Sequence, residues 1–431
     1  MPAPVRPLLA GAYEVAARLA TAVAHIAPAG RSKLLRSLRA RRGVLQRYRE
    51  WAARHRDYSR PLLWIHAPSV GEGLQARPVL ERFRASRSEV QLVYTHFSPS
   101  AASLASRLDV DFHDYLPFDT KHAARALLEA LRPTALVFSK LDVWPTLTRE
   151  ADQRQVRLGL ISATLSEESS RRNNFAAAVL RDAYTRLDVV GAIDAADAER
   201  LTQLGVPRDV IEVTGDTRYD QVWARAAAVD PAGPLLSPLV SGRPTLVAGS
   251  TWPADERVLL PAWAMVRREL PSVRIVIAPH EPTDAHVHPL ERWAEESHLT
   301  ISRLDGPGSA TADLVIVDRV GVLGELYALA DVAFVGGGFH AAGLHSVIEP
   351  AAFGAPVIFG PRWRMSRDAA LLLETGAAAA AEDVAALAAR LRDWLGSADA
   401  RRSAGTKARE VVRSGVGAAE RSVALVSRLI G

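Results

Sequence analysis

Residues 332–349 read VAFVGGGFHAAGLHSVIE, and this stretch decides the fold. Four apolar residues, 332–335, fit a buried strand, and three consecutive glycines follow at once. We expect a helix to open next with His345 and Ser346 and to carry Glu349 one turn in. Glycines let a ligand approach backbone N–H groups closely, and the positive end of a helix favours an anion. The stretch therefore predicts a phosphate-binding turn, with Glu349 placed to accept hydrogen bonds from ribose hydroxyls.

Short apolar runs of the same kind recur from residue 62 onward and alternate with helical patterns rich in Ala, Leu and Arg. Most are continuously apolar, which is typical of parallel strands covered by helices on both faces. We therefore predict a doubly wound α/β fold. The alanine run 377–381 fits a helix start or a loop edge. The expected strands are 62–67, 90–97, 135–139, 158–163, 189–193, 211–214, 245–248, 274–278, 314–317, 332–335 and 357–359.

The segment 230–244 divides these strands into two sets. It contains four prolines and two glycines, so neither a helix nor a strand is expected there. We predict a linker at 230–244 between an N-terminal domain, 61–229, and a C-terminal domain, 245–431. Two such domains normally bind ligands between them, at the carboxyl ends of their strands.

The composition is that of a globular protein, since 48% of the 431 residues are apolar and 23% are charged. The chain contains no cysteine. This excludes disulfide scaffolds, thiolate zinc sites, iron–sulfur clusters and cysteine nucleophiles.

The net charge of +5 hides an asymmetry between the N-terminal segment and the rest of the chain. Residues 1–60 hold 13 Lys and Arg against three acids, whereas the other 371 residues have a net charge of −5. This basic segment suggests an anionic partner, either a membrane or a nucleic acid. Few aromatic residues interleave with the basic ones, which weakens the nucleic-acid alternative; they are Tyr48, Trp51 and Tyr58.

Residues 8–27 are expected to form an amphipathic helix. Its polar stripe contains Glu14, Arg18, Thr21 and His25, and Leu19 lies on the apolar face. No run of 18 uncharged apolar residues is present, so a membrane-spanning helix is not predicted. Two interpretations remain open: the helix lies in a membrane interface, followed by the arginine-rich run 31–60, or it packs on the protein itself.

Three further motifs follow predicted strands. The first, 69–73 (SVGEG), places Glu72 in the first turn of a helix, where it is a general base or a routine capping residue. The second, 140–145 (KLDVWP), brings Lys140 and Asp142 to a strand end, either as site residues or as a surface ion pair. The third, 213–220 (VTGDTRYD), offers Arg218 to a bound anion, although Arg218 could equally pair with a neighbouring acid.

A histidine-rich segment begins at Pro279 and His280 and continues to His286 and His288. The last two could share one face of a strand, but nearby prolines break the segment and the spacing matches no known metal site. We interpret the segment as a loop in which His280 helps to hold a phosphate.

Taken in order along nearly the whole chain, these motifs resemble the 3-deoxy-D-manno-octulosonic acid (Kdo) transferases. The resemblance rests on SVGE at 69–72, WP at 144–145, VTGDTRYD at 213–220, the stretch 336–349 and PVIFGP at 356–361. It implies the GT-B glycosyltransferase fold, with two Rossmann-like domains that face each other across a cleft, the N-terminal domain on the acceptor side. It also implies transfer of Kdo from CMP-Kdo to a lipid A precursor at the inner face of the bacterial inner membrane, without a metal or other cofactor.

The family's functional residues can be carried over by position. Glu72 matches the general base, Asp142 matches an acid of the family's Glu-x-Glu-Leu-Trp-Pro motif, and Arg218 matches a residue that stabilises the transition state. The sequence departs from the family at Lys140, which replaces an acid, at His280, which replaces an arginine, and at 344–346, where Leu-His-Ser replaces Gly-His-Asn. These departures indicate a divergent branch. The implied CMP-binding residues are Pro279, His280, Val320, Gly321, Val322, Gly337, Gly338, His345, Ser346 and Glu349.

The resemblance implies an inverting glycosyltransferase whose partners are CMP-Kdo, the lipid A precursor and an anionic membrane surface, with no nucleic acid. Two alternatives remain: another GT-B enzyme that uses a nucleotide sugar, and a catalytically silent membrane-associated binding protein.

Overall fold

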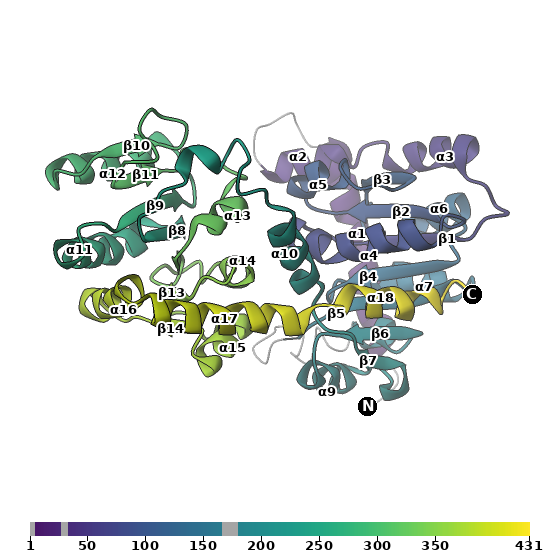
Figure 1. Cartoon of the computed structure of the whole chain (residues 1–431). Helices are drawn as coiled ribbons and strands as arrows, with labels where there is room; N and C mark the ends of the chain where they lie inside the picture. The colour runs from purple at the N-terminus through teal and green to yellow at the C-terminus, as the bar shows by residue number, and fades with distance from the viewer. Residues whose placement is uncertain (1–4, 27–32, 166–179) are drawn as a thin grey trace. The chain divides into compact units, whose positions relative to one another are not determined.

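The computed structural model describes residues 5–26, 33–165 and 180–431 and forms two compact units (Figure 1). The first unit comprises Met1–Gln221 and Gly417–Gly431, and the second comprises Val222–Val416. Each unit is built around a seven-stranded sheet whose neighbouring strands pair in parallel. This confirms the predicted α/β class with parallel strands.

The sheet of the first unit has the order β3-β2-β1-β4-β5-β6-β7. The chain leaves β1 toward β2 on one side and returns to β4 on the other, so the strand order reverses between β1 and β4. All residues of β1, β2 and β4 are buried, as the largely apolar sequences of these strands predict. The strands are β1 (Leu62–His66), β2 (Gln91–His96), β3 (Phe112–Tyr115), β4 (Ala135–Ser139), β5 (Arg157–Ala163), β6 (Val189–Ala192) and β7 (Ile211–Val213).

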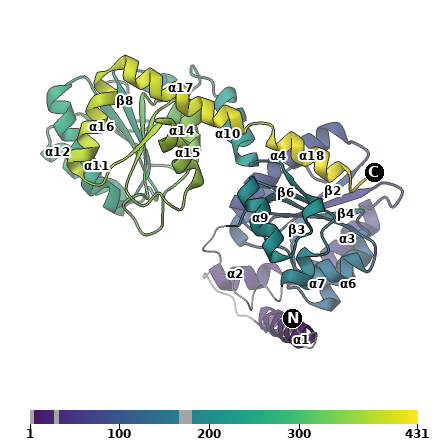
Figure 2. The same cartoon turned by 90° about the horizontal axis from the view of Figure 1, so that it is seen from below.

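Helices cover both faces of this sheet. Leu62 and Trp64 of β1 belong to one buried cluster, whereas Leu63 and Ile65 belong to another, as the alternation of side chains along a strand requires. The C-terminal helix α18 (Ala418–Ser427) packs beside α4 (Val70–Ser86), and Leu425 joins the second cluster (Figure 2). The other helices that matter below are α1 (Val5–Ile26), α2 (Lys33–Ala40), α3 (Val44–His55), α6 (Lys121–Leu131), α7 (Pro145–Asp152) and α10 (Thr217–Ala228).

The sheet of the second unit has the order β10-β11-β9-β8-β12-β13-β14, and its strand order reverses between β8 and β12. Its strands are β8 (Thr245–Thr251), β9 (Arg274–Pro279), β10 (Ile301–Arg303), β11 (Leu314–Ile316), β12 (Val332–Val335), β13 (Val357–Phe359) and β14 (Ala378–Ala380). The helices are α11 (Pro253–Glu269), α12 (Asp284–Glu296), α13 (Leu323–Leu326), α14 (Ile348–Ala352), α15 (Arg367–Thr375), α16 (Val384–Gly396) and α17 (Ala398–Gly415).

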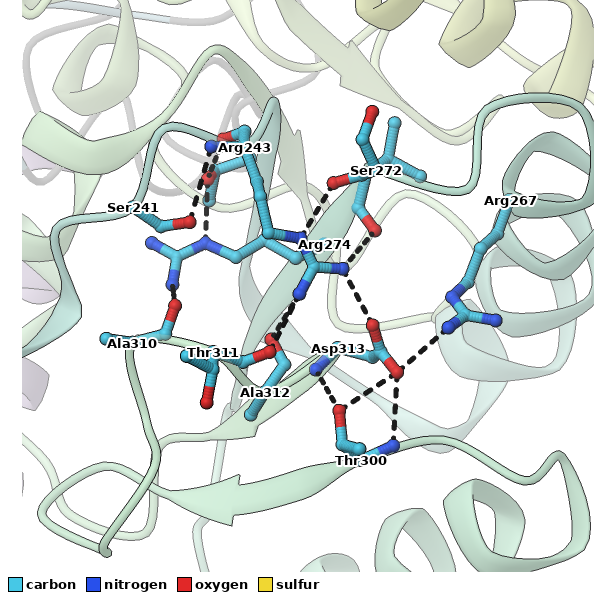
Figure 3. Close-up of polar contacts among 12 residues, drawn as sticks. Ser241, Arg243, Arg267, Ser272, Arg274, Thr300, Ala310, Thr311, Ala312 and Asp313 are labelled. Atoms are coloured by element: carbon cyan, nitrogen blue, oxygen red, sulfur yellow. Dashed lines mark hydrogen bonds and ion pairs between the residues drawn. The ribbon is translucent and has the colours of Figure 1, made fainter.

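A charged network ties the amino ends of these strands together (Figure 3). Asp313, just before β11, accepts hydrogen bonds from Arg243 (2.7 Å) and Arg267 (2.8 Å), and also from the backbone and hydroxyl of Thr300. Burial opposes ionisation of this carboxyl, but the hydrogen bonds from Arg243, Thr300 and Arg267 outweigh it and lower the pKa of Asp313 to about 2. The amino edge of the sheet is thus fixed by ionic contacts, away from the carboxyl ends where ligands bind.

All predicted strands are present, within a few residues at their ends, and three strands were missed: β3, β10 and β14. Each missed strand is short and lies at or next to a sheet edge. The prediction for the alanine run 377–381 was wrong, because Ala378–Ala380 pair with β13 as the edge strand β14. Alanine has low strand propensity, so this pairing is set by the neighbouring strand and cannot be found locally.

The compact units also divide the chain differently from the predicted domains. Helix α10 runs through the boundary at 221–222, and the predicted linker 230–244 places Leu236 and Leu239 in the core of the second unit. Residues 417–431, expected in the C-terminal domain, belong to the first unit. The predicted N-terminal segment 1–60 is not separate either, since Tyr48 and Trp51 of α3 lie in the first unit's core.

Two histidines are buried in the core of the first unit. His66 and His96 end the neighbouring strands β1 and β2, and both are almost completely buried. Burial lowers the pKa of His66 to about 3, assisted by the neighbouring His96, and burial lowers the pKa of His96 to about 4. The folded state therefore contains neutral rings, whereas an unfolded chain takes up protons near pH 6.5.

We predict that these histidines cost stability as the pH falls. The free energy of unfolding is unaffected by these two groups above pH 6.5. Below that pH it falls progressively, by about 2 kcal/mol for each histidine at pH 5. Denaturant midpoints measured from pH 7.5 to pH 5 should fall less steeply in a variant with His66→Gln and His96→Gln. The exposed His288→Gln serves as the control and should keep the parental slope. Equal slopes in all three proteins would contradict the prediction.

Candidate functional site

Glu72 and Lys140 lie on either side of the point where the first sheet reverses its strand order. Glu72 is in the first turn of α4, after β1, and Lys140 directly follows β4. The Nζ of Lys140 is 3.6 Å from Oε1 of Glu72, and the hydroxyl of Ser69 donates to Oε2. The Glu72 side chain is 17% exposed, so a carboxylate of fixed orientation faces the position where α/β sheets bind ligands.

The loop after β4 holds Asp142 beside an aromatic ring. The Nε1 of Trp144 is 3.4 Å from Oδ2 of Asp142, and Trp144 is also the N-cap residue of α7. The Trp144 ring contacts His66 edge-on at 5.6 Å. Lys140 starts this loop with a φ of 68°, in the left-handed region that non-glycine residues rarely adopt. The structure therefore brings Glu72, Lys140 and Asp142 to the same edge of the sheet, as the sequence predicted.

Arg218 is joined to α4 through Asp216 and Gln75. Its guanidinium donates to Oδ2 of buried Asp216 at 2.6 and 2.8 Å. Asp216 is therefore the neighbouring acid with which Arg218 pairs, which the sequence analysis did not identify. The Gln75 amide donates to the same carboxylate at 3.4 Å, and the Gln75 carbonyl accepts from the hydroxyl of Thr217. Because Gln75 lies one turn after Glu72, the same helix positions both predicted residues. Gln75 was missed, since no local motif marks it.

Asp220, the last residue of the motif 213–220, has a structural role. Its carboxylate accepts hydrogen bonds from the backbone N–H groups of Gly417 and Ala419, both at 3.0 Å. These groups open the C-terminal helix α18, so Asp220 acts as its cap. Part of the motif 213–220 therefore stabilises the start of α18.

In the second unit, Asp255 organises the glycine-rich turn. Its buried carboxylate accepts from the N–H groups of Gly337 (2.8 Å), Phe339 (3.0 Å) and Trp252 (2.9 Å). The prediction that the N–H groups of this turn face a phosphate was wrong for Gly337 and Phe339, because Asp255 takes them. The sequence signal was available: Pro253 fits the first helical position, and Asp255 is the third residue of that helix, the capping-box position.

Two of the glycines are required by close contacts. Gly337 has a φ of 91°, and a Cβ atom there would lie 2.1 Å from the carbonyl oxygen of Gly343. A Cβ atom on Gly338 would lie 2.4 Å from the backbone nitrogen of Gly360. The turn therefore packs tightly against its own continuation and against the end of β13.

Three imidazoles and one indole gather beside this turn. The Trp252 ring stacks on His280 (4.4 Å between centroids) and on His340 (4.2 Å), and His280 stacks on His345 (4.7 Å). The Nε1 of Trp252 donates to Nε2 of His345 at 3.2 Å. Burial lowers the pKa of His345, and the neighbouring His280 and His340 lower it further. His280 and His345 were predicted as site residues, whereas Trp252 and His340 were not.

The remaining predicted residues of the second unit lie in loops and one short helix. Pro279 ends β9 in the core, and Val320 (76% exposed), Gly321 and Val322 form the loop between β11 and α13. Helix α14 begins at Ile348, so the predicted start at His345 was wrong; His345 and Ser346 precede the helix, and Glu349 is in its first turn. Burial raises the pKa of Glu349, and Arg225 opposes this shift. The predicted loop was wrong for His286 and His288, which lie on helix α12, and the described residues hold no cluster of three potential metal ligands.

Comparison with known proteins identifies the family. Residues 36–221 match the family model described as 3-deoxy-D-manno-octulosonic-acid transferase. The transferase of that name from Chlamydophila psittaci is 31% identical over 324 residues, which cover 74% of this chain and 73% of that protein. The chain belongs to the 3-deoxy-D-manno-octulosonic acid transferase family. The Haemophilus influenzae transferase is 25% identical over 84% of this chain and 86% of its own length.

The similarity to solved structures confirms the fold of this Kdo transferase family member. The UDP-GlcNAc 2-epimerase from Neisseria meningitidis has a TM-score of 0.64 and covers 85% of this chain and all of its own, at 12% identity. At that identity the match shows the fold alone. Together with the two parallel sheets, it confirms the predicted GT-B fold with Rossmann-like domains, and the chain is a glycosyltransferase by its family.

We predict that Asp255→Asn destabilises the glycine-rich turn. An Asn side chain has a single acceptor oxygen and presents an NH₂ group to N–H donors, so buried donors lose their partner. The expected loss is about 2–4 kcal/mol in the free energy of unfolding, measured by denaturant titration. The matched control is Asp284→Asn, an exposed acid in the first turn of α12, which should change stability little. Similar losses in both variants would show that Asp255 does not hold the turn.

Proposed function

We propose that this enzyme transfers Kdo from CMP-Kdo to a hydroxyl of a lipid A precursor, with inversion at the anomeric carbon. The observation that carries the proposal is the position of Glu72. In a chain of the Kdo transferase family, an oriented carboxylate lies where the first sheet reverses its strand order, 3.6 Å from Lys140. This is the position that an acceptor hydroxyl would approach.

In the proposed reaction, Glu72 accepts the proton of the acceptor hydroxyl. The hydroxyl oxygen then forms a bond to the anomeric carbon of Kdo, and the bond between that carbon and the phosphate oxygen of CMP breaks with its electron pair going to CMP. Arg218 supports the developing negative charge, since its guanidinium is 39% exposed and is oriented by Asp216. Asp142 helps to orient the acceptor beside Trp144. General-base catalysis supplies about 10²–10⁴-fold, and positioning and charge stabilisation supply the rest.

The second unit is proposed to bind the donor. The residues at the carboxyl ends of β8, β9 and β12 supply rings and imidazole nitrogens, because Asp255 already takes N–H groups of the glycine-rich turn. His280 and His345 therefore contact the phosphate in this proposal, and Glu349 accepts hydrogen bonds from the ribose. The walls of this proposed donor site also contain Pro279, Val320, Gly321, Val322, Gly337, Gly338 and Ser346.

The membrane part of the proposal rests on α1, whose residues Tyr13 and Glu14 face the protein, whereas Arg18 of the predicted polar stripe is 68% exposed. Tyr13 hydrogen-bonds buried Asp119, and the Glu14 carboxylate accepts from the N–H of Lys121 at 3.1 Å. Three apolar side chains also point outward: Val15 is 57% exposed, Leu19 63% and Val23 50%. Within the described parts of the chain, we find no helix long and apolar enough to span a bilayer.

A helix with an outward apolar stripe and basic neighbours suits an anionic lipid surface, where its apolar side chains leave water. The two interpretations of residues 8–27 therefore combine, since the helix packs on the protein and still presents a face to lipid. His25 in the predicted polar stripe lies beyond the described side chains. We propose peripheral binding at the cytoplasmic face of the inner membrane, where the acceptor is embedded.

The base assignment is tested by Glu72→Gln. Glutamine keeps the shape but cannot accept the proton, so turnover should fall by about 10²–10⁴-fold while CMP binding stays near the parental value. The assay combines CMP-Kdo generated in situ with a tetra-acylated lipid A precursor and detects the product by mass spectrometry. The matched control is Glu81→Gln, an exposed residue of the same helix. Near-parental turnover of Glu72→Gln would move the base to another residue, with Asp142 the next candidate.

The membrane assignment is tested by placing charges on the apolar stripe. A variant with Leu19→Glu and Val23→Glu should bind vesicles containing phosphatidylglycerol more than about tenfold less well, because two side chains can no longer enter the lipid and two added charges are repelled. The matched control carries Val240→Glu and Met365→Glu, two equally exposed apolar positions of the second unit. Parental co-sedimentation of the stripe variant would falsify this part of the proposal.

A further inference from the structure

The loop that follows β13 packs directly on the glycine-rich turn. It comprises residues 361–366 (PRWRMS) and leads into α15. The N–H of Arg362 donates to the carbonyl oxygen of Gly338 at 3.0 Å, and a Cβ atom on Gly360 would lie 2.5 Å from the carbonyl carbon of Gly338. Because β12 and β13 are parallel neighbours, the turn and the loop both emerge at the carboxyl edge of the second sheet. The loop therefore borders the proposed donor site.

Two exposed arginines of this loop have no counter-charge among the residues that the structure describes. Neither Arg362 nor Arg364 forms an ion pair or a side-chain hydrogen bond with a described residue. By contrast, Arg243 and Arg267 at the amino edge of the same sheet both pair with Asp313. The two positive charges beside the glycine-rich turn are therefore available to an anion that comes from outside the chain.

Local contacts fix the loop that carries the two arginines. The Arg364 guanidinium lies 5.5 Å from the centroid of the half-buried Trp363 ring, which is a cation–π contact. The N–H of Ser366 donates to the Trp363 carbonyl oxygen at 2.7 Å, and the Ser366 hydroxyl caps α15 by accepting from the N–H of Ala369 at 3.3 Å. An anion that reaches Arg364 thus meets a guanidinium whose movement is already restricted, which lowers the entropic cost of binding.

The donor of the proposed reaction carries two negative charges, and the imidazoles assigned to its phosphate answer only one of them. Those imidazoles belong to His280 and His345. The second charge is the carboxylate of Kdo, which is bonded to the anomeric carbon and is ionised at neutral pH. The N–H groups of Gly337 and Phe339 cannot receive this carboxylate, because Asp255 already accepts from them. Cations beside the turn are therefore the groups suited to it.

We propose that Arg362 and Arg364 bind the carboxylate of the donor sugar and thereby select Kdo. The proposal rests on the function proposed above, since it specifies how the same site recognises its donor. A guanidinium offers paired N–H groups whose geometry matches a carboxylate, and such a charge-assisted pair is stronger than a neutral hydrogen bond. A nucleotide sugar without a carboxylate gains none of this binding energy, so the loop discriminates against neutral sugars on the same nucleotide.

The test compares CMP-Kdo with CMP in a variant that carries Arg362→Gln and Arg364→Gln. The carboxylate contact is present in the substrate complex and in the transition state alike. The KM for freshly prepared CMP-Kdo should therefore rise at least about tenfold, while kcat stays within about twofold of the parental value. CMP lacks the carboxylate, so its Kd from titration calorimetry should change by less than about threefold, through screened charge alone. Equal losses for both ligands would assign the arginines to the phosphate and overturn the proposal.

Two further variants separate the geometry of the loop from its charge and its stability. The matched control carries Arg268→Gln and Arg292→Gln, which remove two exposed arginines of the same unit, on α11 and α12, and it should keep the parental KM. A variant with Arg362→Lys and Arg364→Lys keeps the charges but loses the paired N–H groups, so its KM should lie between those of the parent and the Gln variant. It also decides the case if the Gln variant melts early. An equal rise of KM in the control would overturn the proposal.

The outcome can be separated from that of the proposed function. If the parent transfers Kdo with dependence on Glu72 and the loop variants keep the parental KM for CMP-Kdo, the proposed function stands and the carboxylate assignment fails. Calorimetry without acceptor covers the opposite case. If the parent transfers no Kdo but binds CMP-Kdo more tightly than CMP, and the loop variants lose this preference, the carboxylate assignment stands and the proposed function fails.

Discussion

The parallel pairing of the strands is the constraint on which the candidate site depends. When neighbouring strands are parallel, their carboxyl ends meet at one edge of the sheet, and the loops that follow them are neighbours however far apart they lie in sequence. Glu72 after β1 and Lys140 after β4 meet in this way in the first unit. In the second unit the same pairing brings Trp252 after β8 beside His280 after β9. The candidate site residues of each unit therefore include those that follow its central strands.

Buried carboxylates then fix the loops at these edges. Asp255 takes three backbone N–H groups around the glycine-rich turn, Asp119 takes those of Thr146 and Leu147 at the start of α7, and Asp220 takes two at the start of α18. Each carboxylate supplies the negative charge that a helix or turn start favours. Those donors are consequently unavailable to a substrate anion, and in the proposed function the imidazoles beside Trp252 contact the phosphate instead.

The sequence predicts the central strands well because burial on both faces leaves a continuous apolar run, as in β1, β4 and β12. The edge strand β14 has no such signal, since its pairing with β13 decides its conformation. The motifs bring Glu72, Lys140 and Asp142 together correctly because they follow strands that are easy to identify. The role of Asp255 was not predicted, because the glycines were interpreted as the anion site itself. The capping-box spacing between Trp252 and Asp255 was nevertheless present in the sequence. The face of α1 that packs on the protein could not be predicted, because periodicity shows that two faces exist but not which one contacts the protein.

The packing of α1 against Asp119 connects the proposed lipid surface to the candidate site. Asp119 bonds Tyr13 of α1 and also caps α7, whose N-cap residue is Trp144, the ring beside Asp142. Burial raises the pKa of Asp119 to about 6, while its hydrogen bonds to the α7 backbone and to Tyr13 oppose that shift. One carboxylate thus links the helix that faces outward with the loop that carries a candidate site residue. If the proposed acceptor is held in a membrane, α1 and the loop that carries Asp142 need a fixed relative position, and the hydrogen bonds of Asp119 to Tyr13 and to the start of α7 would provide it.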